Sequence, residues 1–258
     1  MSTSPAECAF DRCAARYDEL RPVDDNWWQL FERLVELGEL RGVRVVEVGC
    51  GTGRLADALA ERAHARVWAV DASPEMVAQA KALGVNARLA RAEALPFKRG
   101  WFDAAVMRMV LHLVDRPRAL GELARVLAAH GRLVIATEDP ARFDDVWFTR
   151  WFPSVPAIDG ARFPGEVTLR NELAAAGFGD VRVERLTQER VQHREQALDV
   201  IRSKVYSTFE LLPPEEYAEG LARAEAELPE RLEYEFHWLI VRAARPGWRG
   251  AISVGASS

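Results

Sequence analysis

The spacing of apolar residues predicts alternating strands and helices along most of the chain. Short runs rich in apolar residues, over residues 45–48, 66–70, 87–90, 102–107 and 133–136, are typical of strands buried in a sheet. Between these runs, apolar residues recur at the spacing of helices that pack through one face. The pattern therefore predicts an α/β fold with a largely parallel sheet.

The two ends of this region depart from the alternation. Two helices, over residues 8–20 and 25–38, are predicted before the first strand, and Asp25 is the expected N-cap of the second. After the fifth strand, residues 144–153 are dense in aromatic side chains and lead into a Pro- and Gly-rich break. Aromatic side chains that a short helix cannot bury by itself need a partner surface, either the core or a bound apolar ligand.

The last third of the chain is predicted to hold one more helix, two strands and an insertion. Thr168 is the expected N-cap of the helix. A sixth strand over residues 181–186 and a last strand over residues 234–241 follow it. Two predicted helices, over residues 195–209 and 214–227, lie between these strands as an insertion.

A glycine-rich turn after the first strand organises the rest of the prediction. The strand ends at three glycines spaced one residue apart, Gly49, Gly51 and Gly53, and helix-forming residues follow. Because glycine has no Cβ, the backbone of such a turn approaches a ligand closely, and the free N–H groups of the helix point at polar ligand atoms. The turn therefore predicts a site for a cofactor that contains a nucleoside.

Glu47 distinguishes between the cofactors that such a turn binds. Residues 51–56 also satisfy the G-x-G-x-x-G/A pattern of dinucleotide-binding folds, and Asp71 lies about 20 residues on, where an acid that binds ribose is expected. The spacing therefore leaves NAD open. A carboxylate at Glu47, however, opposes a pyrophosphate and suits the ammonium group of a bound amino acid, which favours S-adenosylmethionine.

Four motifs, in order along the chain, carry a family resemblance. Residues 47–53 (EVGCGTG) and 70–76 (VDASPEM) resemble the first two motifs of class I S-adenosylmethionine-dependent methyltransferases. Residues 92–97 (AEALPF) are similar to the family's adenine-side loop, and residues 125–133 to its last helix-to-strand turn. The motifs span roughly residues 40–140 and most resemble the branch of the ubiquinone-biosynthesis methyltransferases and their small-molecule relatives.

The resemblance implies a Rossmann-like, doubly wound seven-stranded sheet with the last strand antiparallel and with helical cap elements. It also implies one methyltransferase domain over residues 1–245, followed by a loose tail at 246–258. Within that domain we expect an N-terminal helical lid (1–40), a cofactor-binding core (43–140) and substrate cap elements (141–165 and 187–232).

The resemblance also assigns cofactor contacts residue by residue. Asp71 is expected to accept hydrogen bonds from the ribose hydroxyls, and Met76 to pack on the adenine or simply to fill the core. Arg91 stands where many relatives have an aspartate, so the backbone of Ala92 or the side chain of Glu93 is expected to read the adenine. The expected cofactor-binding residues are Tyr17, Arg21, Glu47, Gly49, Cys50, Gly51, Gly53, Asp71, Ala72, Met76, Ala92, Glu93 and Arg108.

The acceptor is expected beside the loop that follows the fourth strand, because ligands of open α/β sheets lie outside the carboxyl ends of the strands. His112 in that loop is the candidate general base, or a structural histidine of the kind that relatives often carry there. Glu138 and Asp139 are alternative bases or substrate contacts, and we prefer to interpret them as solvated loop acids. His193 is a more distant candidate base. The candidate substrate-binding residues in the cap are Trp147, Trp151 and Tyr206.

Composition narrows the class of protein further. The 258 residues carry a formal charge of −5 without a Lys/Arg cluster, which disfavours binding to nucleic acid or to an anionic membrane. Cys8, Cys13 and Cys50 form no C-x-x-C pair, so we expect no disulfide framework and no metal site, and we interpret Cys50 as a small filler beside the cofactor. Without a signal peptide or an apolar run of membrane-spanning length, a cytoplasmic protein is expected. A homodimer is compatible with the sequence.

The predicted function is transfer of a methyl group from S-adenosylmethionine to a small-molecule acceptor, and the aromatic cap suggests an apolar or aromatic one. Because the sulfonium is already an activated leaving group, the protein must chiefly align the reacting atoms and exclude water. Three alternatives remain open: a relative that binds S-adenosylmethionine but catalyses a non-methyl reaction, a non-enzymatic scaffold, and an NAD-dependent oxidoreductase.

Overall fold

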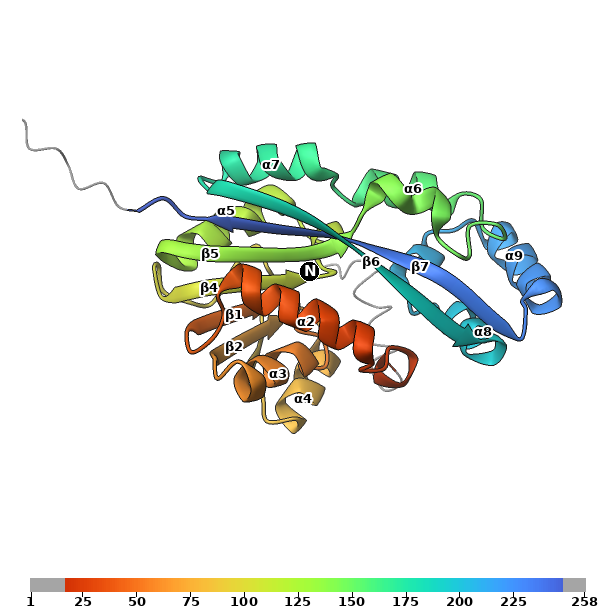
Figure 1. Ribbon diagram of the computed structural model, residues 1–258, viewed down its shortest axis with the longest axis horizontal. Coiled ribbons are helices and arrows are strands. Elements are labelled where there is room, and N and C mark those ends of the chain that lie inside the picture. Colours follow the sequence, from red (N-terminus) through yellow and green to blue (C-terminus); the bar gives the residue numbers. More distant parts are fainter. Residues whose placement is uncertain (1–16, 248–258) are drawn as a thin grey trace, which may run out of the picture.

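Seven strands form one mixed sheet in the computed structural model, which describes residues 17–247 (Figure 1). The strand order is β3-β2-β1-β4-β5-β7-β6. β7 pairs antiparallel with both β5 and β6, whereas β1 to β5 run parallel, so the predicted fold class is confirmed. The strands are β1 (Arg44–Val48), β2 (Arg66–Asp71), β3 (Ala87–Leu89), β4 (Phe102–Arg108), β5 (Leu127–Glu138), β6 (Gly179–His193) and β7 (Arg231–Ala244).

Helices cover both faces of the sheet through two separate apolar layers. On one face, α2 (Asp25–Gly38) and α3 (Arg54–Arg62) pack on β1, β4 and β5, with α4 (Pro74–Ala82) beside them. On the other face, α5 (Arg116–Val126) and α7 (Glu166–Ala175) pack on the same strands and on β7. This arrangement leaves the carboxyl ends of β1, β2, β4 and β5 at one edge, where the loops of a site can gather.

Side-chain caps fix where several helices begin. The Asp24 carboxylate accepts a hydrogen bond from the Trp27 N–H at 2.8 Å, so Asp24 and not the predicted Asp25 is the N-cap of α2. Ser73 and Asp115 cap α4 and α5 in the same way, each followed within two residues by a proline. α7 begins at Glu166 with Gly165 as its N-cap, so the predicted cap at Thr168 is wrong.

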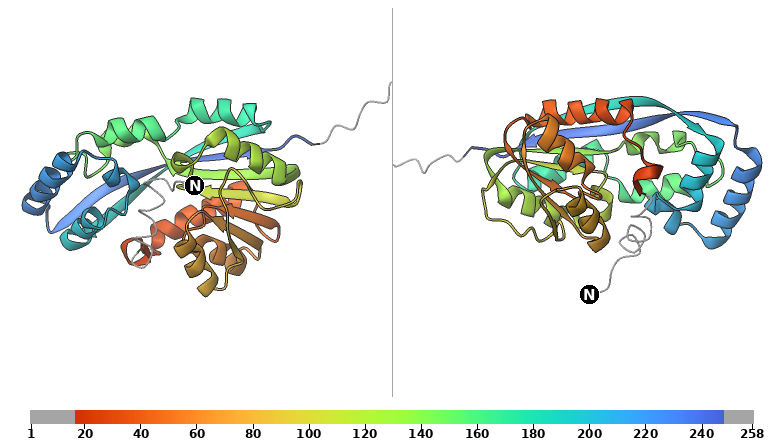
Figure 2. Two further views of the ribbon diagram at one scale, coloured as in Figure 1. Left: turned by 180° about the vertical axis from the view of Figure 1, so that it is seen from behind. Right: turned by 90° about the horizontal axis from the view of Figure 1, so that it is seen from below.

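The inserted region differs from its prediction in length and continuity. β6 and β7 pair as far as His193 and Arg231, well beyond the rest of the sheet, as a two-stranded ribbon (Figure 2). The helix predicted over residues 195–209 is broken, because Lys204 adopts a left-handed backbone with φ of 49°. The result is α8 (Arg194–Arg202) followed by the short helix η3 (Ser207–Glu210).

A third apolar cluster lies around the outer end of this ribbon, and we call it the cap. It is formed by α6 (Val155–Arg162), α8, η3 and α9 (Pro214–Glu227), together with the segment between η2 (Pro140–Asp145) and α6. Figure 2 shows the ribbon carrying α8 and α9 away from the helices that cover the sheet. The two stretches that the sequence predicts as cap elements therefore pack against each other.

Gly220 in α9 provides a test of this packing. A Cβ on Gly220 would lie 2.6 Å from the Trp151 carbonyl oxygen and would overlap the buried ring of Phe152. We expect Gly220→Ala to lower the free energy of unfolding by about 1–3 kcal/mol, because a rigid backbone and a buried ring must both move. Denaturant unfolding measures this change.

The matched control is Gly121→Ala in α5, where a Cβ meets nothing within 4 Å. Since alanine favours a helix over glycine by up to about 1 kcal/mol, this control is expected to hold or raise the stability. A Gly220→Ala protein as stable as the Gly121→Ala protein contradicts the close contact between α9 and the segment before α6.

Candidate active site

The turn after β1 contains three glycines. At two of them the backbone packs closely against neighbouring residues, and at the third there is open space where a side chain would lie. Gly49, Gly51 and Gly53 all have positive φ, of 76°, 54° and 90°. A Cβ on Gly49 would overlap the side chain of Val110, and a Cβ on Gly53 would lie 2.8 Å from Ala80. A Cβ on Gly51 would meet nothing within 4 Å, so the open side of the turn lies at Gly51.

Asp71, at the end of β2, holds this turn through its carboxylate. Its Oδ2 accepts a hydrogen bond from the Gly51 N–H at 2.8 Å, and its Oδ1 accepts one from the Ser73 N–H at 2.9 Å. A carboxylate oxygen accepts more than one hydrogen bond, so both oxygens retain capacity toward the space beside them. Two adjacent ribose hydroxyls fit such an acceptor pair.

A cavity of about 820 Å³, open to solvent, lies in front of the turn, and we call it the loop cavity. It brings together residues from the ends of β1, β2, β3 and β4. The predicted cofactor-binding residues that line it are Tyr17, Gly49, Gly51, Asp71, Ala72, Met76, Ala92, Glu93 and Arg108. Sequence reasoning missed its other walls, which include Ser73, Val110, Leu113 and Val114 and have no motif of their own.

The predicted adenine-side loop is anchored to α5. Glu122 accepts a hydrogen bond from the Leu95 N–H at 2.7 Å, and Arg125 donates to the carbonyls of Leu95 and Phe97 at 2.9 and 2.8 Å. One oxygen of Glu93 accepts a hydrogen bond from the Asp115 N–H at 2.9 Å. These bonds fix the loop against the cavity, and a contact of Ala92 or Glu93 with adenine stays a prediction.

A second cavity, which we call the lid cavity, adjoins the first and contains Glu47 and Arg108. Glu47 is 2 % exposed, its Oε2 has no hydrogen-bond partner, and burial raises its pKa to about 8 against a lowering effect from Arg108. Within residues 17–247, Arg108 makes no ion pair or hydrogen bond, and its guanidinium lies 5.6 Å from the ring centre of Trp238. An acidic and a basic side chain at one wall of the cavity suit the ammonium and the carboxylate of a bound amino acid.

Residues of the N-terminal segment close the lid cavity. The Thr52 hydroxyl donates to the Asp18 carboxylate at 2.8 Å, and Arg54 pairs with the same carboxylate at 2.9 Å. The Arg21 guanidinium lies between the rings of Tyr17 and Tyr206, 5.2 and 4.8 Å from their centres. The segment therefore ties the glycine turn to the cap. Residues 1–16 of the predicted lid, and residues 248–258 of the predicted tail, lie outside the described residues.

Two predicted cofactor residues have mainly structural surroundings. Burial raises the pKa of the Cys50 thiol, so the thiol stays protonated and is no nucleophile. Cys50 lines the lid cavity beside Gly51. Gly53 lines neither cavity and instead forms the N-cap of α3, packed against Ala80.

A third, inner cavity lies beyond Met109 and contains His112 and Glu138. The imidazole of His112 stacks on Phe163 with ring centres 4.0 Å apart, and its Nδ1 is buried without a hydrogen-bond partner. Burial, with the nearby Arg162 and Arg21, lowers the pKa of His112 to about 3. A group with a pKa this low accepts protons poorly at neutral pH, which disfavours His112 as the general base, and its role stays a prediction.

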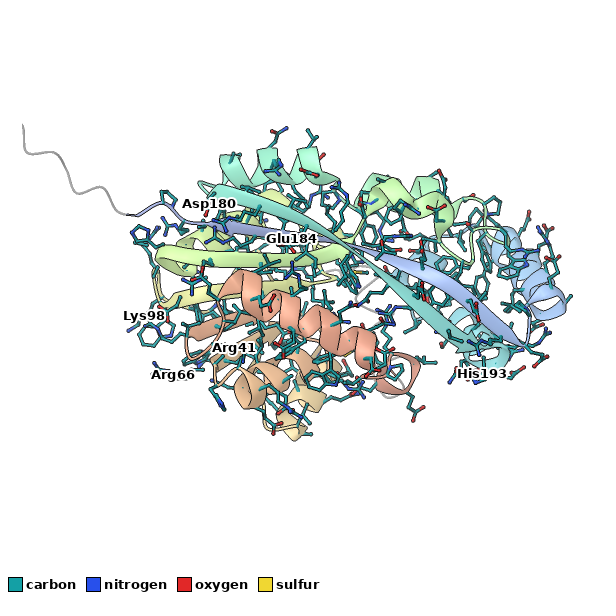
Figure 3. All side chains as sticks on the ribbon, in the orientation of Figure 1. Arg41, Arg66, Lys98, Asp180, Glu184 and His193 are labelled. Atoms are coloured by element: carbon teal, nitrogen blue, oxygen red, sulfur yellow. The ribbon has the colours of Figure 1, made fainter. Side chains whose placement is uncertain are left out.

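Glu138 and Asp139 are not the solvated loop acids that we preferred to expect. Burial raises the pKa of Glu138 to about 8, and its side chain lines the inner cavity. Asp139 is 4 % exposed, caps η2 and pairs with Arg185 at 2.8 Å. The prediction failed because the chain continues into η2 and α6, which cover this edge. His193 lies at the far end of the β6–β7 ribbon, beside α8 (Figure 3).

The cap aromatics divide between packing and cavity walls. Trp151 is 2 % exposed and donates its indole N–H to Glu227 at 2.9 Å, and Trp147 packs within the same cluster. Neither indole lines the lid or inner cavity, which does not support their predicted contact with an acceptor. Tyr206 lines both cavities, and the neighbouring Phe148, which the prediction passed over, lines the inner one.

Residues 17–247 contain neither a metal-binding cluster nor a membrane-spanning helix. No group of three or more His, Cys, Asp or Glu side chains there is arranged to hold a metal ion. No helix in the same range is long and apolar enough to cross a membrane.

Comparison with known proteins agrees with this geometry. Residues 46–135 match a family model described as a methyltransferase domain. The chain is 35% identical over 210 residues to a demethylmenaquinone methyltransferase of Thermus thermophilus, covering 69% of this chain and 94% of that protein. It is 29% identical over 206 residues to a ubiquinone/menaquinone biosynthesis C-methyltransferase of Citrifermentans bemidjiense, covering 67% and 87%.

A solved structure shares the fold: phosphoethanolamine N-methyltransferase 2 of Haemonchus contortus with S-adenosyl-L-methionine, at a TM-score of 0.65 and 18% identity, covering 95% of this chain and 60% of that one. The chain belongs to the S-adenosylmethionine-dependent methyltransferase family. It is an enzyme whose cofactor is S-adenosylmethionine, so the NAD-dependent and non-enzymatic alternatives are excluded.

The buried Glu47 predicts a proton linked to cofactor binding. With a pKa of about 8, Glu47 is mostly protonated at pH 7 in the free protein, and a neighbouring ammonium favours its charged form. We expect the binding of S-adenosylmethionine to release about one proton from each site at pH 7. At pH 9, where Glu47 is already ionised, we expect much less proton release. Calorimetric titration in two buffers of different protonation enthalpy measures the release.

The control for this measurement is Glu47→Gln, which removes the titrating group and keeps its size. Its binding is expected to be weaker and to release no proton at pH 7. The same release in the variant, or none in the unsubstituted protein, contradicts the placement of the cofactor ammonium at Glu47.

Proposed function

We propose that this enzyme methylates a ring carbon of a hydroxylated aromatic acceptor of the quinol type. The names of the relatives support a quinol: a demethylmenaquinone methyltransferase and a ubiquinone/menaquinone C-methyltransferase, each covered over most of its length. The observation that carries the proposal is the arrangement of the cavities, which leads from the glycine turn to an aromatic chamber.

Tyr17 and Met109 border all three cavities, so the cofactor side and the acceptor side meet at these two residues. Met109 has a left-handed backbone with φ of 56°, which is uncommon for a residue other than glycine. Its N–H donates to the Ala136 carbonyl on β5 at 2.8 Å, which holds this conformation. The junction is therefore built on the sheet and not on a free loop.

Aromatic rings line the acceptor side of this junction. Phe148, Phe163 and Tyr206 lie around the inner cavity, and Tyr234, Phe236 and Trp238 lie on the far wall of the lid cavity. Flat rings that border a cavity suit a planar aromatic ligand, because stacked and edge-to-face contacts both become available. Side chains with polar ends, such as Glu138 and Tyr206, provide partners for ring hydroxyls.

Methyl transfer requires no covalent intermediate with the protein. The cofactor supplies a methyl group that is already activated by its sulfonium. The chain's own residues hold the two reactants: Asp71 and the glycine turn on the cofactor side, and the cap and lid rings on the acceptor side. Tyr17 and Tyr206 line both the lid cavity and the inner cavity, so bound reactants displace water from the space between these rings.

Methyl transfer to a demethylmenaquinol with a short prenyl chain tests the proposal. The purified protein is incubated with S-adenosylmethionine and the reduced acceptor under anaerobic conditions, and the product is analysed by mass spectrometry and NMR. We expect one added methyl group on the unsubstituted carbon of the quinol ring. A methyl ether, or no product from this acceptor while another small molecule is methylated, contradicts the proposed acceptor and position.

A further inference from the structure

We propose that Glu138 is the general base, accepting the proton of an acceptor hydroxyl that enters the inner cavity. This inference rests on the proposed function, because it takes the acceptor to be a ring that carries a hydroxyl group. Three observations support it: the position of Glu138 on the sheet, the lack of partners of its carboxylate and the charges that face it.

Glu138 lies at the same edge of the sheet as the junction between cofactor and acceptor. Arg108 at the end of β4 pairs with Ala136 on β5, two residues before Glu138. Because side chains alternate along a strand, Arg108, Ala136 and Glu138 point to the same face. Glu138 therefore lies on the same face of the sheet as Arg108 on the cofactor side, two residues further along β5 than Ala136. Its side chain lines the inner cavity together with Met109 and His112.

Glu138 is an acid without a partner in a cavity whose other polar groups are mostly satisfied. Asp159, the second acid of the inner cavity, accepts hydrogen bonds from Thr208 at 2.8 Å and from Arg162 at 3.0 Å, and Arg162 also donates to Ser207 at 2.7 Å. Glu138 is half-buried and borders the same cavity, and among residues 17–247 its carboxylate makes no hydrogen bond or ion pair. A carboxylate that borders a cavity without a protein partner is free to accept a hydrogen bond from a ligand bound there.

The surroundings of Glu138 bring the pKa of its carboxyl group close to neutral pH. Burial is the largest cause of its raised pKa of about 8, the charge of Asp159 raises it further, and the charge of Arg21 lowers it. Tyr206 and His112 also border the cavity, and both are uncharged at neutral pH, since burial raises the pKa of the phenol and lowers that of the imidazole. A base with a pKa near the working pH transfers protons efficiently.

The bonds of the proposed step balance without a further reactant. The hydroxyl O–H bond of the acceptor breaks, and its proton moves to the Glu138 carboxylate. The electron pair left on the oxygen is delocalised into the ring, and a ring carbon forms the new bond to the methyl carbon. The methyl–sulfur bond breaks and its electron pair returns to sulfur. Loss of the ring proton to solvent then restores the aromatic ring and returns an electron pair to the oxygen, which takes its proton back from Glu138.

A binding test that needs no turnover uses 1-naphthol and naphthalene as matched probes. The protein is first saturated with S-adenosylhomocysteine, whose ammonium keeps Glu47 ionised, and each probe is then titrated by fluorescence at pH 6.5 and 8.5. We expect 1-naphthol to bind roughly tenfold more tightly at the higher pH, because a carboxylate accepts the hydroxyl hydrogen bond better than a carboxylic acid does. Naphthalene, which has no hydroxyl, is expected to show no change.

Glu138→Gln is expected to remove this pH dependence, and Asp139→Asn is expected to keep it, because Asp139 is paired with Arg185 and lies outside the inner cavity. The proposal is overturned if wild-type protein binds 1-naphthol equally at both pH values or not at all, or if Glu138→Gln shows the wild-type pH dependence.

Kinetics with the methyl acceptor provides the second test. We expect Glu138→Gln to lower kcat by ~100-fold or more with an unchanged KM for S-adenosylmethionine, and to abolish the rise of the rate through about pH 8. Glu138→Asp is expected to keep that rise at a lower kcat. If methylation occurs on oxygen or on a different acceptor, the proposed function fails, while the naphthol titration still decides the role of Glu138.

Discussion

The carboxylate of Asp71 is the constraint on which the rest of the site depends. It accepts the Gly51 and Ser73 N–H groups, and so joins the turn after β1 to the turn after β2. Without this acceptor, the Gly51 N–H loses its hydrogen bond, and its left-handed backbone is no longer held. The turns that precede α3 and α4 are then no longer linked to each other. Asp71 also lines the loop cavity, so one group both holds the turn and offers acceptors where the ribose is predicted to bind.

The cofactor side and the acceptor side of the site each contain their own ionisable groups. On the cofactor side, Glu47 and Arg108 suit a zwitterion, and they lie under a lid that is itself tied to the glycine turn through Asp18. On the acceptor side, Glu138 is surrounded by aromatic rings and by a polar network centred on Asp159 that satisfies itself. Met109 lies between the two ends and is held to β5 through its backbone. Burial raises the pKa of both Glu47 and Glu138 to about 8, so each carboxyl group is mostly protonated at pH 7 in the free protein.

The sequence predicted the cofactor half of the site far better than the acceptor half. Asp71 and the glycines belong to short local motifs, each made of a strand, a turn and the start of a helix. Neighbouring residues in the sequence determine the backbone conformation of such a motif. The acceptor half is assembled from η1, the end of β5, α6 and η3, which are far apart in the chain, so no local pattern marks it. Residues 187–193 alternate polar and apolar side chains too weakly to predict that β6 continues as a ribbon, and that ribbon decides where α8 and α9 lie. The tryptophans of the cap were conspicuous in the sequence, but tertiary packing buries them and leaves Phe148 and Tyr206 at the cavity.

The central claim is that the turn held by Asp71 is the S-adenosylmethionine site. Calorimetric titration of the protein and of Asp71→Ala with S-adenosylmethionine, S-adenosylhomocysteine and NAD tests it most directly, with circular dichroism to verify that the variant is folded. The account predicts that both sulfur nucleosides bind the unsubstituted protein, that a folded Asp71→Ala protein loses this binding, and that NAD binds neither. Binding of NAD without either sulfur nucleoside, or undiminished binding of S-adenosylmethionine by the variant, would contradict it.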